Sequence, residues 1–445
     1  MEIIIPRDEN GNPLHPAVQA TALAKYSRSP LSIREILATL TPEEADKFQD
    51  KWTNAYGHSS VEELCSIPVC FEGVSIIASK VLESFQRAGY SEKSTRYQEF
   101  SKDSFVKNIK TFTHIKHSLN EEVEFLYDAY QRLGRALTPL VRQKMFGSSA
   151  TLSQKEESAL KARVFDNVRY LLPAGTCTNV GAVANGRDIK YMCRTLLSHP
   201  LAELRDIGIK FVEQLRSFNP VLVSSIDTQP AINQFASIKD IGFDLGMNDW
   251  RVYMCNCSDN VIPRLSRLLS SHYGIELPVF LEMLKNRDKT PVPSVLRRFR
   301  ADFYIQMDYG AYRDLQRHRR CEQYSEILSA KNGYLVPDDI LGTELEKDYL
   351  ETMNEARNNY FNCAEAHLYS EEELQYIVPL GYLHRSIFSM DLEELFYIVE
   401  LRTKPQGHIS YRRVAYRMYE QAYRAWPELM KCCQAVRPTE IGLHT

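Results

Sequence analysis

The feature that most constrains the fold is an approximate repeat with a period of nearly half the chain. Its markers are a proline after two apolar residues, a later arginine and a Glu-Gln pair: Pro173, Arg205 and Glu213 in the first half, and Pro379, Arg412 and Glu420 in the second. The proline and the arginine are 32 and 33 residues apart, and the arginine and the glutamate are 8 residues apart in both halves. A unit this long predicts two paired domains rather than a solenoid of short repeats.

A stretch bracketed by prolines marks the boundary between the two units. Residues 218–232 contain Pro220 and Pro230 and lack a strong helical period. The chain of 445 residues is also longer than one hydrophobic core usually supports. We therefore predict a first domain over residues 1–218 and a second, more diverged copy over residues 233–445.

Apolar periodicity predicts the content of each unit. Helix-type spacing covers most of residues 118–146, about 344–368 and about 409–434. Residues 66–81 are richer in β-branched side chains and contain Gly73, which predicts a strand that leads into a helix. The expected fold class is α+β, with two tandem copies of one helix-rich domain and a strand layer in each.

Composition argues against several classes of partner. The formal net charge of −3 gives no global reason to expect a nucleic-acid partner. No apolar run approaches the roughly 20 residues that span a bilayer, and the first residues lack a signal-peptide core, so no membrane partner is expected. The ten cysteines form no C-x-x-C pair, which predicts reduced thiols, a cytoplasmic location and no metal site.

Two polar clusters in the first third of the chain are candidates for binding. Residues 56–63 place His58 and Ser59 beside the start of a helix, although Ser60 as N-cap with Glu63 in a capping box explains the segment structurally and is favoured by local chemistry. Residues 90–97 contain a serine and an arginine that could hold a phosphate on a loop. A solvated polar turn explains that second cluster equally well.

A third cluster, Arg317-His318-Arg319-Arg320, lies in a helix-like run over residues 312–327. Consecutive helical side chains point about 100° apart, so these four cannot share a ligand unless the helix ends there. A solvated run of charge is the usual explanation. Residues 304–312, which precede the cluster, are rich in apolar and aromatic side chains, so the segment enters from a buried element. This favours an anion site at the end of that element.

A fourth cluster joins Arg169-x-x-Leu172-Pro173 to Asn185-Gly186-Arg187, with twelve residues from Pro173 to Asn185. Arg187 could meet a phosphate or a flavin carbonyl, or it could be a surface residue beside a helix-start asparagine. The sequence contains no G-x-G-x-x-G or Walker-type loop, which disfavours a Rossmann or P-loop nucleotide site. It also lacks the G-x-S-x-G and H-E-x-x-H motifs.

Taken in order, the four clusters resemble the motifs of flavin-dependent thymidylate synthases: GH-x-S-x-x-E, then RHR followed by S-x-x-E-x-S-x-R-Y, then R-x-x-L-P and a later N-x-R. The first half resembles the family over about residues 20–215, and the second half more faintly over about 235–430. The first half carries Gly57-His58-Ser59-Ser60, Glu92-x-Ser94-x-Arg96-Tyr97, Arg169-x-x-Leu172-Pro173 and Asn185-x-Arg187, whereas the second carries Arg317-His318-Arg319 and the late Arg402.

Each half lacks motifs that the other keeps. The first half has Ser84-Phe85-Gln86 in place of RHR and Leu196 in place of the late arginine. The second half has Thr290-Pro291 in place of GH, Gln375 in place of the arginine before L-P, and Asp391 and Glu393 in place of N-x-R. Members of the family that this chain resembles are homotetramers with sites assembled from several subunits. The resemblance therefore implies a homodimer of the fused chain, with a site drawn from both halves.

The resemblance also implies roles for individual residues. The implied catalytic residues are Arg317 and Arg402. The implied substrate contacts are Glu92, Ser94, Arg96, Tyr97, Arg169 and Asp314. The implied cofactor contacts are His58, Ser59, Asn185, Arg187, Arg317, His318 and Arg319. In such a site FAD passes hydride, methylenetetrahydrofolate provides the one-carbon unit and NADPH reloads the flavin.

Asp314 leaves the substrate open. It stands three residues before the RHR, where the family commonly has a glutamine that faces the base. An ionised carboxylate cannot donate a hydrogen bond to a uracil carbonyl, so a cytosine-like edge is conceivable. Three functions therefore stay open: methylation of dUMP, modification of another pyrimidine nucleotide, and flavin or nucleotide binding without catalysis.

Overall fold

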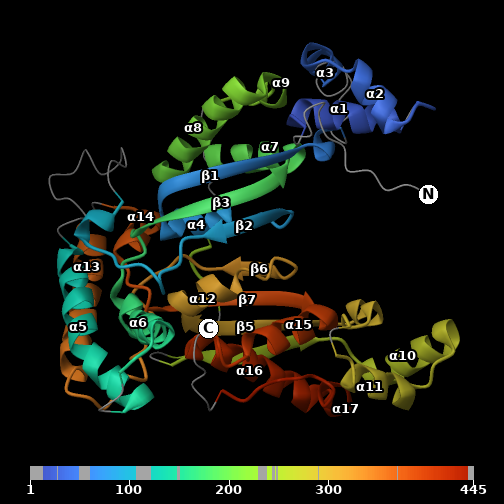
Figure 1. Cartoon of the computed structure of the whole chain (residues 1–445). Coiled ribbons are helices and arrows are strands. Elements are labelled where there is room, and N and C mark those ends of the chain that lie inside the picture. The colour runs from blue at the N-terminus through green and yellow to red at the C-terminus, as the bar shows by residue number, and fades with distance from the viewer. Residues whose placement is uncertain are drawn as a thin grey trace.

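The computed structural model describes residues 14–27, 29–49, 61–106, 122–147, 151–228, 238–242, 246, 249–288, 290–367 and 369–438 (Figure 1). Each half of the chain contains one small antiparallel sheet with helices packed against it. The strand order is β1-β3-β2 in the first sheet and β4-β5-β7-β6 in the second. The predicted α+β class with two tandem copies is confirmed.

The first half opens with three helices and then combines strands and helices. Its elements are α1 (Pro16–Tyr26), α2 (Ile33–Thr39), α3 (Pro42–Gln49), η2 (Glu62–Leu64), β1 (Ser66–Ser75), α4 (Ile76–Leu82), β2 (Ala88–Glu92), η3 (Lys102–Ser104), α5 (Glu124–Phe146), α6 (Gln154–Val168), η5 (Arg169–Leu171), β3 (Cys177–Asn185), α7 (Gly186–Leu197), α8 (Ala202–Phe218) and α9 (Pro220–Val223). The predicted passage from strand to helix over residues 66–81 is confirmed as β1 followed by α4.

The second half repeats this order after a different beginning. Its elements are β4 (Arg251–Cys257), α10 (Val261–Leu268), η6 (Leu269–Tyr273), α11 (Leu277–Lys285), η7 (Ser294–Arg298), β5 (Arg300–Asp308), α12 (Tyr309–Leu315), β6 (Glu322–Ser325), α13 (Glu346–Glu365), α14 (Glu371–Leu374), η8 (Gln375–Ile377), β7 (Leu383–Asp391), α15 (Leu392–Arg402), α16 (Ile409–Ala425) and α17 (Pro427–Met430). From β5 onward these elements match those from β1 onward. Thus α12 corresponds to α4, β6 to β2, β7 to β3, and α15 to α7.

Most of the predicted helices lie where the periodicity placed them, as α5, α13 and α16. One prediction was wrong: the helix-like run over residues 312–327 ends at Leu315, and Glu322–Ser325 form the strand β6. Strand β6 pairs with the edge of β7, and these tertiary hydrogen bonds outweigh the local helical pattern. The end of α12 therefore falls just before Arg317.

The two halves meet at an approximate two-fold axis through the prolines of the sequence repeat, because Pro173 and Pro379 form an antiparallel bridge. Four backbone hydrogen bonds surround it in symmetric pairs: Ala174 N to Val378 O (2.9 Å), Leu380 N to Leu172 O (2.9 Å), Gly175 N to Tyr376 O (2.8 Å) and Gly381 N to Tyr170 O (2.9 Å). The domain boundaries predicted at residues 218 and 233 stay a prediction, and part of the intervening stretch lies outside the described residues.

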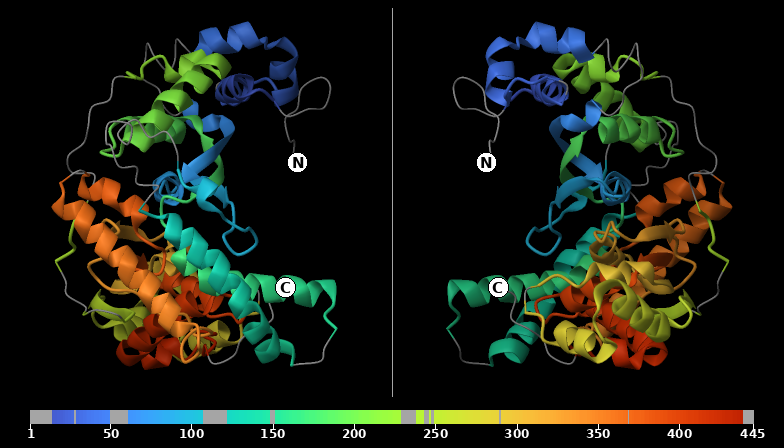
Figure 2. Two further views of the ribbon diagram at one scale, coloured as in Figure 1. Left: turned by 90° about the vertical axis from the view of Figure 1, so that its left-hand side faces the viewer. Right: turned by 90° about the vertical axis from the view of Figure 1, so that its right-hand side faces the viewer.

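Helices from the two halves also pack together. Helices α5 and α13 contact each other and lie beside α6 (Figure 1). Helices α1, α2 and α3 (blue) lie at one end of the molecule and α16 and α17 (red) at the opposite end, with the sheets between them (Figure 2). Helix α7 packs against β3, and α15 and α16 pack against β5. This arrangement leaves β2 of the first half beside β6 and α12 of the second (Figure 1).

We predict that one buried carboxyl after β6 makes stability depend on pH. Glu326 accepts hydrogen bonds from Asn332 Nδ2 (2.6 Å) and Arg385 N (3.3 Å), and burial raises its pKa to about 7. The folded state then holds a proton that the unfolded state releases above its ordinary pKa of about 4.5. Stability should therefore fall by about 1–3 kcal/mol as pH rises from about 4.5 to 7.

The measurement is the free energy of unfolding of the wild type and of Glu326→Gln across this pH range. Glutamine keeps the acceptor oxygen but does not titrate, so the variant should lose this part of the pH slope. Identical slopes in the two proteins would contradict the prediction.

Candidate functional site

A cleft lies between the two halves, at the end of β2. The first half contributes Glu92 and the loop after it, together with Arg169 at the start of η5. The second half contributes α12 and the turn that follows. The residues that line the cleft are Glu92, Lys93, Ser94, Thr95, Arg96, Arg169, Gly310, Arg313, Asp314 and Arg317. The structure thus brings together five of the six predicted substrate contacts and Arg317.

The end of α12 explains how the RHR segment serves a site. The helix begins at Asp308, whose carboxylate accepts from Ala311 N (2.7 Å), and it ends at Leu315. A turn follows, in which His318 N donates to Leu315 O. Consecutive side chains therefore diverge: Arg317 is exposed at the cleft, whereas His318 is buried.

The two arginines that follow His318 pair with protein groups instead of the cleft. Arg319 donates to Ala88 O (3.1 Å) and lies over the ring of Tyr90, 4.7 Å from its centroid. Arg320 pairs with Asp391 and Glu393, each at 3.1 Å. The cluster is therefore neither one anion site nor a purely solvated run of charge.

A buried ion-pair network joins the halves at the floor of the cleft. Glu92 accepts from Arg313 Nη2 of the second half (2.7 Å) and from Lys80 Nζ (3.0 Å), and Lys80 also pairs with Glu83. Burial raises the pKa of Glu92, but the two cations outweigh it and lower the pKa to about 2. Glu92 is therefore ionised at neutral pH and holds Arg313 in place.

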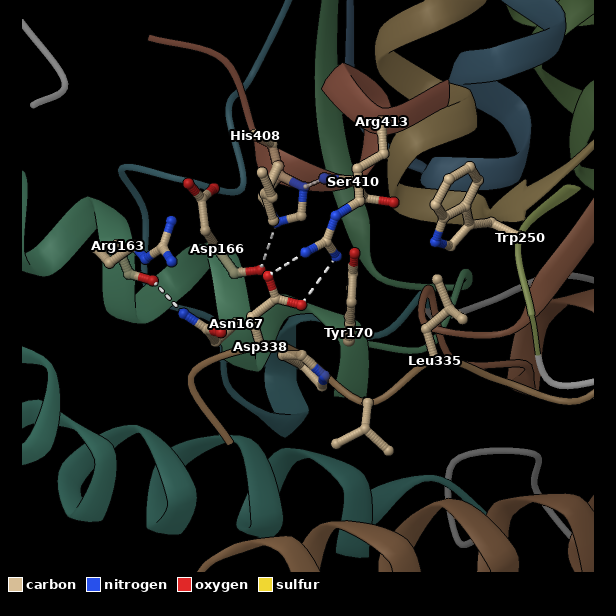
Figure 3. A pocket seen from close by; sticks show the side chains of 13 residues that line it. Arg163, Asp166, Asn167, Tyr170, Trp250, Leu335, Asp338, His408, Ser410 and Arg413 are labelled. Atoms are coloured by element: carbon tan, nitrogen blue, oxygen red, sulfur yellow. Dashed lines mark hydrogen bonds and ion pairs between the residues drawn. The ribbon is translucent and has the colours of Figure 1, made fainter. Parts of the chain in front are cut away.

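Arg96 is fixed from the opposite side by Asp166. Its Nε and Nη2 donate to the two carboxylate oxygens at 2.7 and 2.9 Å, a bidentate geometry. Figure 3 shows Asp166 at a small enclosed pocket behind the cleft, beside His408, Ser410 and Tyr170. Burial raises the pKa of Asp166, but His408, Arg169 and Arg96 outweigh it and lower the pKa. The second pocket thus supports the cleft by anchoring Arg96.

Arg169 is the unusual residue of the cleft. It is only 3% exposed, and its Nε and Nη2 have no hydrogen-bond partner among the described residues. It forms an ion pair with Asp314, with 3.6 Å from Nη2 to Oδ2. Buried guanidinium donors are normally satisfied, so these atoms are available to a ligand that enters the cleft. With Arg96, Arg313 and Arg317 nearby, the cleft suits an anionic ligand.

Arg402 approaches the cleft indirectly, through two side chains. Its Nε donates to His318 Nε2 (2.7 Å), and its guanidinium lies over the ring of Tyr411 at 5.5 Å. Burial raises the pKa of Tyr411, and the charges of Asp314, Arg402 and Arg96 also act on it, although this ring does not itself line the cleft. Sequence reasoning missed Tyr411, Asp166 and Lys80. It also missed Arg313, although the position of this residue next to the candidate Asp314 could have indicated a place at the site.

Asn185 and Arg187, two further predicted cofactor contacts, lie apart from the cleft. Asn185 caps α7 by accepting from Asp188 N (2.9 Å), and it borders a crevice with Gln86, Arg87 and Gly89. Arg187 pairs with Glu63 (2.6 Å) and is half exposed. For the fourth cluster, the structure therefore shows a surface arginine beside an asparagine that caps a helix, which is the structural explanation given above. The crevice lies at the Ala88 end of β2 and the cleft at its Glu92 end.

Three predicted contacts are not placed at either position. His58 and Ser59 lie outside the described residues, as does the proposed N-cap Ser60. Tyr97 is 57% exposed and does not line the cleft. Among the described residues there is no group of acidic, histidine or cysteine side chains that could hold a metal ion. No helix in the same part of the chain is long and apolar enough to cross a membrane.

Comparison with known proteins agrees with the tandem architecture. Residues 12–221 and 278–428 match the family described as "Thymidylate synthase complementing protein", and these two segments contain the two structural copies. The chain belongs to the thymidylate synthase complementing protein family. The family predicted from the motifs is confirmed.

Two relatives match most of this chain and most of their own length. A UPF0159 protein of Chlamydia pneumoniae is 30% identical over 89% of this chain and 86% of its own length. A UPF0159 protein of Chlamydia muridarum is 28% identical over 96% and 91%, respectively. Among solved structures, a UMP/dUMP methylase from Streptomyces cacaoi bound with 5-Br dUMP covers 42% of this chain and 95% of its own, at 15% identity and a TM-score of 0.36. That structural similarity is too low to inform on function.

Proposed function

We propose that this protein is a flavin-dependent enzyme that transfers a one-carbon unit to a pyrimidine nucleotide and reduces it. The simplest such reaction methylates dUMP to dTMP with methylenetetrahydrofolate and NADPH. One observation carries the proposal: the buried Arg169 lines a cleft where arginines of both halves converge, and two of its donor nitrogens have no hydrogen-bond partner among the described residues. A nucleotide phosphate, or a pyrimidine oxygen that gains negative charge, would satisfy these donors.

The residues of the cleft could assist such a reaction without acting as nucleophiles. Arg96 and Arg313 are held by Asp166 and Glu92, so they are oriented before the nucleotide binds. Arg317 is exposed and is not held in this way, so it can close on the ligand, whereas Arg169 is already buried at the cleft. Fixed positive charge of this kind stabilises negative charge that develops on the base during addition at its ring.

The residues along β2 fit a flavin. Arg319 Nε is buried without a hydrogen-bond partner among the described residues, and the crevice presents the polar Asn185, Gln86 and Arg87 above the open Gly89. Arg319 and the exposed backbone and side chains of the crevice would hold the cofactor, and when bound FAD would supply hydride. His318 has both ring nitrogens engaged by protein groups, so we assign it no polar contact with the cofactor.

Asp314 supports a second candidate, modification of a cytosine-containing nucleotide. Its side chain lines the cleft and forms an ion pair with Arg169, at 3.6 Å. A carboxylate accepts from an exocyclic amino group, whereas uracil offers a carbonyl at the same position.

A homodimer of the fused chain, with four domains in all, belongs to the same proposal, as does a cytoplasmic location.

The proposal is tested on purified protein. An oxidised-flavin absorbance spectrum, saturable binding of dUMP and folate-dependent formation of dTMP are the expected results. Tighter binding of dCMP than dUMP would favour the second candidate. Nucleotide and flavin binding without turnover under any donor would leave a non-catalytic binding protein, and the absence of both ligands would refute the proposal.

We predict that Arg317→Ala weakens dUMP binding by about tenfold to a hundredfold, because a charge-assisted hydrogen bond contributes about 1.5–3 kcal/mol. Arg317 is exposed, so the variant should fold normally. If Arg96 serves the same ligand, the losses in Arg96→Ala and Arg317→Ala should be non-additive in the double mutant. Arg216→Ala, which removes an exposed arginine of α8 away from the cleft, is the control. Unchanged dUMP affinity in Arg317→Ala with intact fold would count against a shared site.

A further inference from the structure

A chain of three buried or half-buried side chains runs behind the cleft in the second half. Glu394 Oε1 lies 3.2 Å from His318 Nδ1, and Arg402 Nε lies 2.7 Å from His318 Nε2. Glu394 and His318 are 3% and 5% exposed. The nitrogen of an arginine can only donate, so His318 Nε2 must be the acceptor. The ring proton therefore resides on Nδ1 and is donated to Glu394.

The first half provides an internal comparison for this chain. At the positions of His318 and Arg402 it has Phe85 and Leu196, and both are buried. The surroundings are otherwise alike: Phe85 meets the ring of Tyr191 at 5.7 Å, and His318 meets that of Tyr397 at 5.6 Å.

The anion at the end of the chain is also matched. Asp188 pairs with Arg87 at 3.0 Å in the first half, as Glu394 lies 3.6 Å from Arg320 in the second. The fold therefore accepts apolar residues where the second half has His318 and Arg402. A polar chain that the fold does not require points to a role in the site.

We propose that Glu394 is a positioning residue, which holds His318 in the Nδ1–H form so that Nε2 anchors Arg402 beside the cleft. This inference rests on the proposed function for the role of Arg402. Without Glu394, the proton is free to move to Nε2, where it would face the donor Nε of Arg402 and break the anchor. Arg402 would then leave the ring of Tyr411, over which its guanidinium lies at 5.5 Å.

Burial supports the neutral state of the ring on which the anchor depends. It lowers the pKa of His318, although the hydrogen bond to Glu394 opposes the shift, and the charge of Arg402 lowers the pKa further. A doubly protonated ring would have no acceptor for Arg402.

The first test reads the tautomer directly and needs no ligand. The ring nitrogen NMR shifts of His318 should show the Nδ1–H form in the wild type and in Glu394→Gln, whose amide oxygen still accepts. Glu394→Ala should lose that preference. An unchanged tautomer in Glu394→Ala would overturn the proposal, whatever the protein's substrate.

The second test measures dUMP affinity by titration. Glu394→Ala should weaken it by about tenfold, the low end of a charged hydrogen bond, whereas Glu394→Gln should retain most of it. The matched control is Asp188→Ala, the equivalent position of the first half, which should leave dUMP affinity unchanged. In a His318→Phe background, Glu394→Ala should cause no further loss, and an additive loss would overturn the proposal.

Two further outcomes separate the possible failures. If Glu394→Ala does not fold, His318→Phe and Arg402→Leu take its place, because both introduce residues that the first half already has. They should weaken dUMP binding equally and without additivity, and additive losses would overturn the anchor. If the wild type binds neither dUMP nor dCMP, the proposed function fails, and the NMR test still decides the tautomer.

Discussion

Arg169→Gln is expected to lose about a hundredfold or more of nucleotide affinity while remaining as stable as the wild type. The side chain is buried in the cleft, and its Nε and Nη2 have no hydrogen-bond partner among the described residues, although Nη2 lies 3.6 Å from Asp314 Oδ2. A ligand that fills these donors gains a charged, desolvated contact, and loss of such a contact costs about 2–5 kcal/mol. The free protein loses little, since a buried guanidinium without full pairing contributes weakly to stability or opposes it.

The fold itself suggests the substitution. Gln375 occupies the equivalent position of the second half, where its Oε1 accepts from Leu328 N (3.0 Å). Glutamine is therefore compatible with this turn of the backbone. Binding is measured by titration of dUMP and stability by denaturant unfolding. Gln375→Ala is the control, and it should lower stability without changing affinity.

Two results would contradict this account of Arg169. The first is unchanged dUMP affinity in a folded Arg169→Gln protein. The second is a loss of stability above about 2 kcal/mol, which would show a structural ion pair in place of a ligand contact.

Gly175→Ala is expected to destabilise the protein by more than about 3 kcal/mol, or to prevent folding. A Cβ at this position would overlap the ring of Phe105 and lie 2.9 Å from the backbone oxygen of Tyr376. The same oxygen accepts from Gly175 N at 2.8 Å across the junction of the two halves. The backbone of η8 could move away from the new Cβ only by breaking this hydrogen bond and opening the Pro173–Pro379 bridge.

The chain offers graded controls for this prediction. At Gly381, the symmetric position, a Cβ would meet only side-chain atoms, at 3.0 Å from Tyr349 Oη and 3.2 Å from Met353 Cε. Gly381→Ala should therefore cost less, about 1–2 kcal/mol. At Gly89 no atom lies within 4 Å, so Gly89→Ala should be near neutral. Equal unfolding free energies for all three variants would refute the junction as the critical contact.

Equivalent residues of the two halves show why the sequence identity between the halves underestimates their structural similarity. Ser75 ends β1 and donates to Glu203 Oε2 of α8 at 2.7 Å. In the second half the acid ends the strand, as Asp308, and the serine is on the helix, as Ser410, and the two again share a hydrogen bond. The same buried pair is present with its members exchanged. An alignment counts two mismatches where the packing is conserved.

The sequence by itself determined the period of the repeat, the long helices, the strand that leads into α4 and the division of motifs between the halves. These features depend on local periodicity and on residue type, which can be read along the chain. Only the tertiary structure decided that α12 ends before Arg317, because the pairing of β6 with β7 competes with the local helical pattern. It also decided that Arg96 faces Asp166, that Arg402 is held by His318, and that Nε and Nη2 of the buried Arg169 have no hydrogen-bond partner in the part of the chain that the structure describes. Such contacts join residues far apart in sequence, and their energies depend on burial and on the direction of each side chain, which no local pattern specifies.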